Sequence, residues 1–172
     1  ACSEGYFYEA INGASREKLP VVFVIQNNKF GISVPLHEQT ANLVVSDNFI
    51  GFKHLKIIKC DGRDVFDSYR ALKEAQEYAL SGAGPVFVHA DCDRIGSHSN
   101  SDNHELYRTP EEIQEMKDRD PLPAFRNAIL AKKILTEEEL LAIEEENKNA
   151  IFAAADIAEI APDPLGSSYL DF

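Results

Sequence analysis

Residues 21–35 read VVFVIQNNKFGISVP, and this stretch decides the fold. Its first part, residues 21–25, consists of β-branched and aromatic residues without polar alternation. Such a run is typical of a central parallel strand that helices cover on both faces. Gln26, Asn27 and Asn28 follow directly, at the carboxyl end of the predicted strand, where open α/β sheets bind their ligands. We therefore expect a ligand site at this strand end.

Further strands and helices alternate with this one along the chain. A helix over residues 3–17, which Ser3 is expected to cap, precedes the first strand, and LKIIKCDG at 55–62 is a second strand. Asp64 is expected to cap the helix that follows, and GPVFVHADC at 84–92 is a third buried strand. Alternating strands and helices predict an α/β fold with a parallel sheet flanked by helices.

The second part of the chain is predicted to be helical. Thr109 and Thr136 each begin a capping box, and the last helix carries one apolar stripe that we expect to pack on the edge of the domain. We predict a partial domain over residues 1–172, with an α/β part at 1–108 that carries the ligand loops and a helical extension at 109–172.

Composition excludes several classes of protein. The 172 residues carry a formal net charge of −12, which argues against a nucleic-acid surface. The three cysteines share no metal-type spacing and are expected to be reduced thiols. No run approaches the roughly 20 apolar residues of a membrane helix, so we expect no membrane partner.

Three clusters carry possible chemistry: Gln26-Asn27-Asn28, the turn at Asp61-Gly62, and a loop of about fifteen residues that contains His98. The side-chain oxygen of Asn28 suits Mg²⁺, but an Asx turn at the strand end explains the same residues. His98 lies in GSHSNSD, where a histidine is either exposed or catalytic. The serines beside it could accept phosphate, whereas the absence of a G-x-S-x-G elbow argues against a serine hydrolase.

Two segments resemble one known family. ACSEGYFYEAINGASREKLPVVFVIQNNKFGISVP at 1–35 resembles the thiamine diphosphate motif of the α subunit of 2-oxo acid dehydrogenase E1 components. DRIGSHSNSDNHELYRTPEEI at 93–113 resembles the ordered loop of that subunit over the cofactor. The likeness extends over the whole chain and is nearest to the branched-chain type. It implies the pyrophosphate-domain portion of the thiamine diphosphate-binding fold, from the C-terminal portion of an α subunit or of a fused α–β protein.

The resemblance also implies the roles of particular residues. The side-chain oxygen of Asn28 and the backbone carbonyl of Phe30 would bind Mg²⁺, while Gln26 and the amide of Ala1 would reach the diphosphate. His98 would contact thiamine diphosphate and assist acyl transfer to the lipoyl group. The Gly-Asp-Gly that opens the family motif would precede Ala1. Asp93 and Ser97 depart from the family pattern, which commonly has Tyr at the first position and Gly or His at the second.

The activity that the resemblance implies is oxidative decarboxylation of a 2-oxo acid with acyl transfer to lipoyl-E2. The implied partners are an E1 β subunit or domain, the lipoyl domain of E2 and further copies in a homo- or hetero-oligomer. The implied location is the cytoplasm in a bacterium and the mitochondrial matrix in a eukaryote. We expect this chain alone to be inactive and its loop to be mobile without cofactor and partner. The alternative is a truncated, non-catalytic fold that serves as a subunit-assembly module without cofactor.

Overall fold

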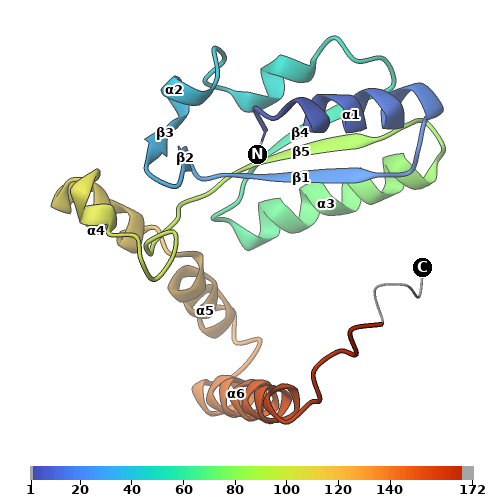
Figure 1. Cartoon of the computed structure of the whole chain (residues 1–172). Helices are drawn as coiled ribbons and strands as arrows, with labels where there is room; N and C mark the ends of the chain where they lie inside the picture. Colours follow the sequence, from blue (N-terminus) through green and yellow to red (C-terminus); the bar gives the residue numbers. More distant parts are fainter. Residues whose placement is uncertain (1, 168–172) are drawn as a thin grey trace. The chain divides into compact units, whose positions relative to one another are not determined.

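The computed structural model describes residues 2–167, and the chain divides into two compact units, Ala1–Phe125 and Arg126–Phe172 (Figure 1). The first unit contains the sheet and the candidate site. The expected division into an α/β part at 1–108 and a helical part at 109–172 was based on the type of secondary structure, and it stays a prediction. Ala1, which was expected to contact the diphosphate, lies outside the described residues.

A three-stranded parallel sheet forms the centre of the first unit. Its strands are β1 (Val22–Asn27), β4 (Lys56–Asp61) and β5 (Val86–Asp91), in the order β1-β5-β4. The predicted parallel α/β architecture is therefore confirmed. The expectation that residues 21–25 form a central strand is wrong, because β5 is central and β1 lies at the edge of this sheet. An apolar run indicates that both faces of a strand are covered. It does not indicate whether the strand has neighbours on one edge or on both edges.

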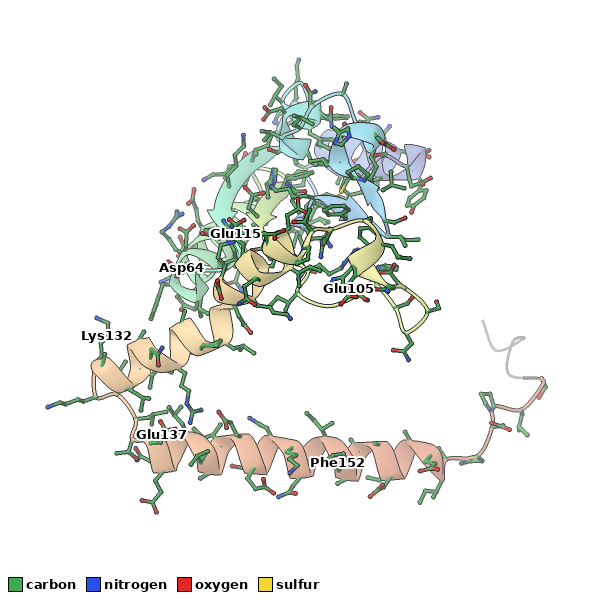
Figure 2. All side chains as sticks on the ribbon, turned by 90° about the vertical axis from the view of Figure 1, so that its left-hand side faces the viewer. Asp64, Glu105, Glu115, Lys132, Glu137 and Phe152 are labelled. Carbon is green, nitrogen blue, oxygen red and sulfur yellow. The ribbon has the colours of Figure 1, made fainter. Side chains whose placement is uncertain are left out.

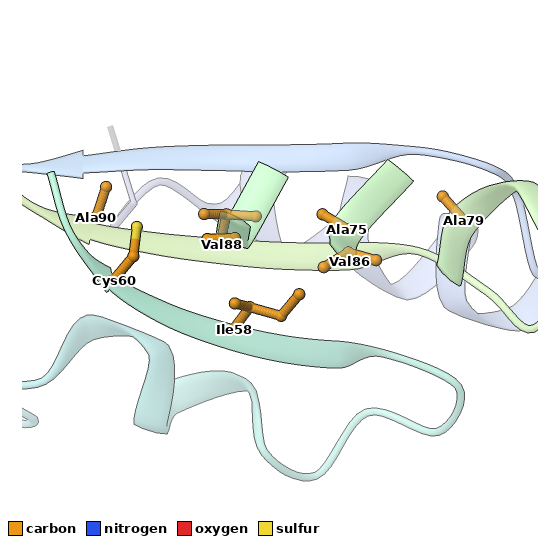
Figure 3. Packing of buried hydrophobic residues seen from close by; sticks show 8 residues of the cluster. Ile58, Cys60, Ala75, Ala79, Val86, Val88 and Ala90 are labelled. Atoms are coloured by element: carbon orange, nitrogen blue, oxygen red, sulfur yellow. The ribbon is translucent and has the colours of Figure 1, made fainter. Parts of the chain in front are cut away.

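Helices cover both faces of this sheet. Helix α1 (Gly5–Glu17) lies on one face and α3 (Val65–Leu80) on the other (Figure 1). Because successive side chains of a strand point to opposite faces, Val86 and Val88 of β5 pack with α3, whereas Phe87 packs on the α1 side. Figure 3 shows the α3 side, where small alanines let the helix approach the sheet closely.

The segment between β1 and β4 contains a hairpin and short helices. Its elements are β2 (Phe30–Gly31), β3 (Val34–Pro35), α2 (Leu36–Gln39) and the 3-10 helix η1 (Val45–Phe49). The hairpin turn places Ile32 at φ 59°, which is unfavourable for a β-branched residue. Two-residue hairpin turns usually carry Gly, Asn or Asp at such positions, so the sequence contained no signal for this one.

The helix caps test the local predictions. Asp64 caps α3, and Thr109 and Thr136 form complete capping boxes at the starts of α4 (Pro110–Asp118) and α6 (Glu137–Glu159). These three predictions are confirmed. The prediction for Ser3 is wrong, because its hydroxyl donates to the Gln39 carbonyl at 3.0 Å and provides no cap for α1.

Two more short elements complete the chain, the 3-10 helix η2 (His104–Leu106) and α5 (Pro121–Ala131). Helix α6 has no buried residue, and its apolar positions, such as Ile151 and Phe152, are exposed (Figure 2). Packing of its stripe on the domain edge stays a prediction. Among the described residues, no helix has the length and apolar character needed to span a bilayer.

Candidate functional site

The carboxyl ends of the three strands meet at one edge of the sheet. Asn27 of β1, Asp91 of β5 and Asp61 of β4 are in register, so the polar residues that follow the strands share one rim. Open α/β sheets bind their ligands at such an edge. Every group considered below lies at this rim.

A pocket of about 330 Å³ opens beside the end of β1. Gln26, Asn28 and Phe30 line it together with Cys2 and Ser3, which directly precede α1. The volume lies at the lower end of the range for ligand sites, roughly 300–1,000 Å³. The structure therefore brings together three of the residues that the sequence singled out. The described residues that line this pocket do not include His98.

The turn after β1 is an Asx turn. The Phe30 backbone N–H donates to Oδ1 of Asn28 at 3.0 Å, and Lys29 between them has a φ of 68°. This is the simpler of the two explanations offered by the sequence. It is compatible with the other one, because an amide oxygen has two lone pairs and the turn uses only one of them. Asn28 therefore keeps an acceptor site for a cation.

The geometry of the hairpin leaves the carbonyl of Phe30 free of β3. The Leu36 N–H donates to the Lys29 carbonyl at 2.8 Å, and the next pair along the ladder is Phe30 with Pro35. Paired residues in an antiparallel ladder alternate between bonded and non-bonded, so the polar groups of Phe30 point away from β3. Pro35 also has no N–H to offer. The Phe30 carbonyl thus lies on the same side of its strand as the N–H that contacts Asn28.

The start of α1 supplies donors rather than acceptors. Glu4 occupies the N-cap position without a side-chain hydrogen bond to the helix, and no other described side chain caps it. Uncapped N–H groups and the helix dipole favour an anion at this end. Cys2 and Ser3, which precede α1 in the chain, line the pocket together with the oxygen acceptors Asn28 and Phe30, a combination that fits a magnesium diphosphate.

A buried polar network contacts the residue that precedes the turn after β1. Asn27 is 5% exposed and its amide nitrogen lies 3.0 Å from both Nε2 of His89 and Oδ1 of Asp91. Nδ1 of His89 lies 3.0 Å from the hydroxyl of the buried Ser46, and Lys29 forms an ion pair with Asp91. Sequence reasoning missed this network, since His89 lies within an apolar run and Ser46 lies in a segment without periodicity.

Burial and charge set the protonation states in this network. Burial lowers the pKa of His89, and the Asp91 carboxylate offsets that only in part, so the imidazole is neutral at pH 7. Burial raises the pKa of the Asp91 carboxyl, but the Lys29 ammonium outweighs burial and holds this pKa below its ordinary value. The network therefore contains one ion pair and a neutral histidine.

The loop that carries His98 is tied to the hairpin through a chain of hydrogen bonds. The His98 backbone N–H and the Tyr107 hydroxyl both donate to Oδ2 of Asp102, at 2.7 and 2.6 Å. Arg94 donates to the Tyr107 hydroxyl and to the Ile32 carbonyl, at 2.7 Å in each case. Hydrogen bonds with Tyr107 and the His98 N–H lower the pKa of Asp102. The imidazole of His98 is exposed, so the loop is held at its base and its histidine remains free.

Phe30 is also the surface on which the base of the loop packs. The Arg108 guanidinium lies 4.5 Å from the centre of the Phe30 ring, and the Tyr107 ring lies 5.7 Å from it. Arg108 donates to the Arg94 carbonyl at 2.8 Å as well. Phe30 thus serves two purposes, because its ring anchors the loop while its backbone carbonyl faces the candidate cation site.

Asp93, which departs from the family pattern, has a structural partner of its own. Its carboxylate accepts from Arg119, the C-cap residue of α4, at 3.0 and 3.3 Å and lies 3.6 Å from Arg63. The side chain is only 14% exposed, so these contacts are shielded in part from water. Asp93 therefore links the start of the loop to α4.

A metal site made only of His, Cys, Asp and Glu is not available here. Among the described residues, no group of three or more such side chains could hold an ion. Burial raises the pKa of Cys2 at the pocket, which keeps it a thiol. Amide and carbonyl oxygens are therefore the cation ligands offered by the described lining of the pocket beside β1, which contains no carboxylate.

Comparisons with known proteins identify the family of the chain. The family model described as "Dehydrogenase E1 component" matches residues 1–165. The chain is 35% identical over 170 residues to the 2-oxoisovalerate dehydrogenase subunit alpha of Bacillus subtilis (strain 168), covering 99% of this chain and 51% of that protein. It is 38% identical over 165 residues to the mitochondrial pyruvate dehydrogenase E1 component subunit alpha of Dictyostelium discoideum, covering 95% of this chain and 43% of that protein.

A third relative, the pyruvate dehydrogenase E1 component subunit alpha of Mycoplasma pneumoniae, is 40% identical over 153 residues, covering 87% of this chain and 42% of that protein. The chain thus spans about half the length of the curated relatives it matches. The family match covers nearly the whole sequence and both motifs that line the rim. The chain belongs to the dehydrogenase E1 component family.

Proposed function

We propose that this chain is the part of a 2-oxo acid dehydrogenase E1 α component that holds Mg²⁺ and thiamine diphosphate. The observation that carries the proposal is the pocket beside β1, where Asn28 and Phe30 come together with Cys2 and Ser3, the residues that precede the uncapped helix α1. Hard oxygen ligands beside an anion-binding helix end are what a magnesium diphosphate requires.

Each residue of the pocket has a distinct task in this proposal. Asn28 and the Phe30 carbonyl hold Mg²⁺, and Gln26 donates a neutral hydrogen bond to the diphosphate. When bound, thiamine diphosphate supplies the electron sink that lets a 2-oxo acid lose CO₂. His98, exposed on its loop, holds or delivers a proton during acyl transfer to the lipoyl group.

The relatives support a substrate class rather than one substrate. One is named for 2-oxoisovalerate and another for pyruvate, at 35% and 38% identity, so we propose a 2-oxo acid in general. The partners proposed are an E1 β subunit or domain and the lipoyl domain of E2. The proposed location is the cytoplasm in a bacterium and the mitochondrial matrix in a eukaryote, and the Dictyostelium relative is named mitochondrial.

Titration of the intact protein, assembled with its β partner, with thiamine diphosphate at fixed Mg²⁺ tests the proposal. Asn28→Ala removes a metal ligand and should weaken Mg²⁺-dependent binding by more than about 100-fold, the upper end of the loss for outer-shell groups. Asn28→Asp keeps an oxygen at the same place and should retain binding. Asn100→Ala, in the exposed part of the loop, is the matched control and should leave affinity unchanged.

Turnover of the same protein with pyruvate, 2-oxoglutarate and branched 2-oxo acids then identifies the substrate. An intact protein that binds no thiamine diphosphate would refute the enzyme proposal and favour the assembly module. The isolated chain holds only part of the ligand set, so we expect it to bind the cofactor weakly or not at all. Micromolar binding to the isolated chain would contradict that expectation.

A further inference from the structure

The central strand β5 carries a histidine at a position where an apolar residue would be expected. His89 is 3% exposed and lies between two buried partners, Asn27 of β1 and Ser46 of η1. It lies in the sheet directly next to the end of β1, with Ile25 as its register partner. Buried polar side chains are costly unless each one is satisfied, so this histidine calls for an explanation.

The partners of Asn27 define which nitrogen of His89 carries the proton. A carboxylate only accepts hydrogen bonds, so the side of Asn27 that faces Asp91 at 3.0 Å must be its amide nitrogen. The same nitrogen lies 3.0 Å from Nε2 of His89, whereas Oδ1 of Asp91 lies 3.4 Å from Nε2, so the shorter contact favours Nε2 as the accepting, unprotonated nitrogen. Nδ1 then carries the hydrogen and donates it to the Ser46 hydroxyl.

This arrangement fixes both the orientation of Asn27 and the start of the turn. With its amide nitrogen held by His89 and Asp91, the side chain of Asn27 cannot rotate without leaving a buried donor unsatisfied. The Asn27 carbonyl also accepts from the Cys92 N–H at 3.2 Å. Asn28 follows directly, so its position relative to the sheet depends on how firmly Asn27 is held.

We propose that His89 is a positioning residue for the cation site: through Asn27, it holds the turn that presents Asn28 and the carbonyl of Phe30 to the metal. The metal in this statement rests on the function proposed above, whereas the mechanical link between His89 and the turn does not. Outer-shell groups that orient metal ligands typically change metal affinity by 10–100-fold when they are removed.

The identity of the side chain at position 89 can be varied in two ways that separate positioning from packing. His89→Leu fills the site but accepts no hydrogen bond, whereas His89→Gln keeps an acceptor for Asn27. Val88→Ala is the matched control, because Val88 is equally buried in β5 but lies in the cluster on the α3 side. All three variants change the packing around β5, and only the first removes the acceptor that position 89 offers to Asn27.

Residue-resolved hydrogen exchange of the intact, cofactor-free protein measures the link. The Phe30 N–H, which closes the Asx turn, should exchange about 10-fold faster or more in His89→Leu, because the buried amide of Asn27 loses an acceptor. It should change less than about 3-fold in His89→Gln and in Val88→Ala. The Val86 N–H, bonded to the Val21 carbonyl at 2.9 Å, reports global unfolding and serves as the reference.

Two further measurements complete the test. Nitrogen-15 spectra of histidine-labelled protein at pH 7 should show His89 with Nδ1 protonated and Nε2 unprotonated. In the protein that binds thiamine diphosphate, His89→Leu should weaken Mg²⁺ by about 10–100-fold, with rescue in His89→Gln.

The proposal would be overturned by an Nε2–H tautomer or an imidazolium, or by unchanged Phe30 exchange in a folded His89→Leu protein. If His89→Leu does not fold, the tautomer and the exchange rate in His89→Gln decide. Failure of the proposed function would instead show as absence of cofactor binding in the native protein, which leaves the exchange result unaffected. Exchange at Phe30 that responds to His89 without any change in Mg²⁺ affinity would also contradict the positioning role.

Discussion

The turn at the end of β1 and the loop around His98 contribute to the same rim in opposite ways. The turn is supported from the central strand by His89, which is 3% exposed. The tip of the loop is exposed, and its connection to the hairpin passes through Asp102, Tyr107 and Arg94 in sequence. One region is held by buried contacts, and the other is held at its base only.

In the proposed function, this difference separates two tasks: the turn holds the metal, and the loop takes part in acyl transfer. Metal ligands need a fixed geometry, and regular elements provide it better than loops do. A histidine that meets a partner's lipoyl group needs to reach outward, and an exposed loop with an anchored base allows that. Breaking either support should therefore affect a different step.

The largest expected effect concerns His98. In the assembled enzyme, His98→Ala should reduce overall complex activity by about 10²-fold or more, the scale for a positioned acid or base. Decarboxylation measured with an artificial electron acceptor should fall much less, because that half-reaction does not need transfer to the lipoyl group. Equal losses in both assays, with thiamine diphosphate still bound, would show that the loop serves the whole reaction. His104→Ala, in the same loop, is the control.

Acidification should loosen the turn before it loosens the loop. The pKa of His89 is lowered by burial, so the unfolded chain takes up this proton first. Its contribution to stability is complete above about pH 6.5 and is lost as the pH falls toward the lower folded-state pKa, by at most about 1.4 kcal/mol per pH unit. Asp91, Lys29 and Lys59 are the charged groups that act on it. The pKa of Asp102 is lowered by Tyr107, so its contribution is lost only below about pH 3.9.

Denaturant unfolding between pH 7.5 and pH 5 measures this effect. The native protein should lose stability more steeply than His89→Gln, which cannot take up a proton at that position. Both carboxyl groups named above remain ionised throughout this range, so they do not contribute. Parallel curves for the two proteins would show that His89 titrates alike in the folded and unfolded chains.

The smallest expected effect separates the two tasks of Phe30. Phe30→Leu removes the ring beneath Arg108 but keeps the backbone carbonyl. Loss of a cation–π contact worth about 0.5–1 kcal/mol should speed hydrogen exchange at the base of the loop about 2- to 5-fold. Mg²⁺ affinity should stay unchanged, and Phe30→Tyr should resemble the native protein in both respects. A loss of affinity as large as in Asn28→Ala would place the ring, rather than the carbonyl, at the metal.

Predictions from local patterns were confirmed where the physics is local. Asp64, Thr109 and Thr136 cap their helices because a cap satisfies N–H groups only two or three residues away. The three predicted strands are likewise present, because a short run of β-branched residues is by itself a local signal for a buried strand. The Asx turn at Asn28 is also an interaction across two residues.

Predictions failed where a neighbour distant in sequence decided the outcome. Ser3 could have capped α1, but its hydroxyl found the Gln39 carbonyl, 36 residues away. Ile32 has a positive φ, which is unfavourable for a β-branched residue. Its backbone carbonyl accepts a hydrogen bond from Arg94, 62 residues away.

Local patterns in the sequence predicted the main helices and strands, their order and the motif that offers Asn28, Phe30 and His98, because these features depend on residues a few positions apart. Only the tertiary structure decided that His89 would reach Asn27, 62 residues away, and Ser46, 43 residues away. Those contacts exist because β5 pairs with β1 and η1 packs on the same face, and strand order of that kind leaves no trace in local periodicity.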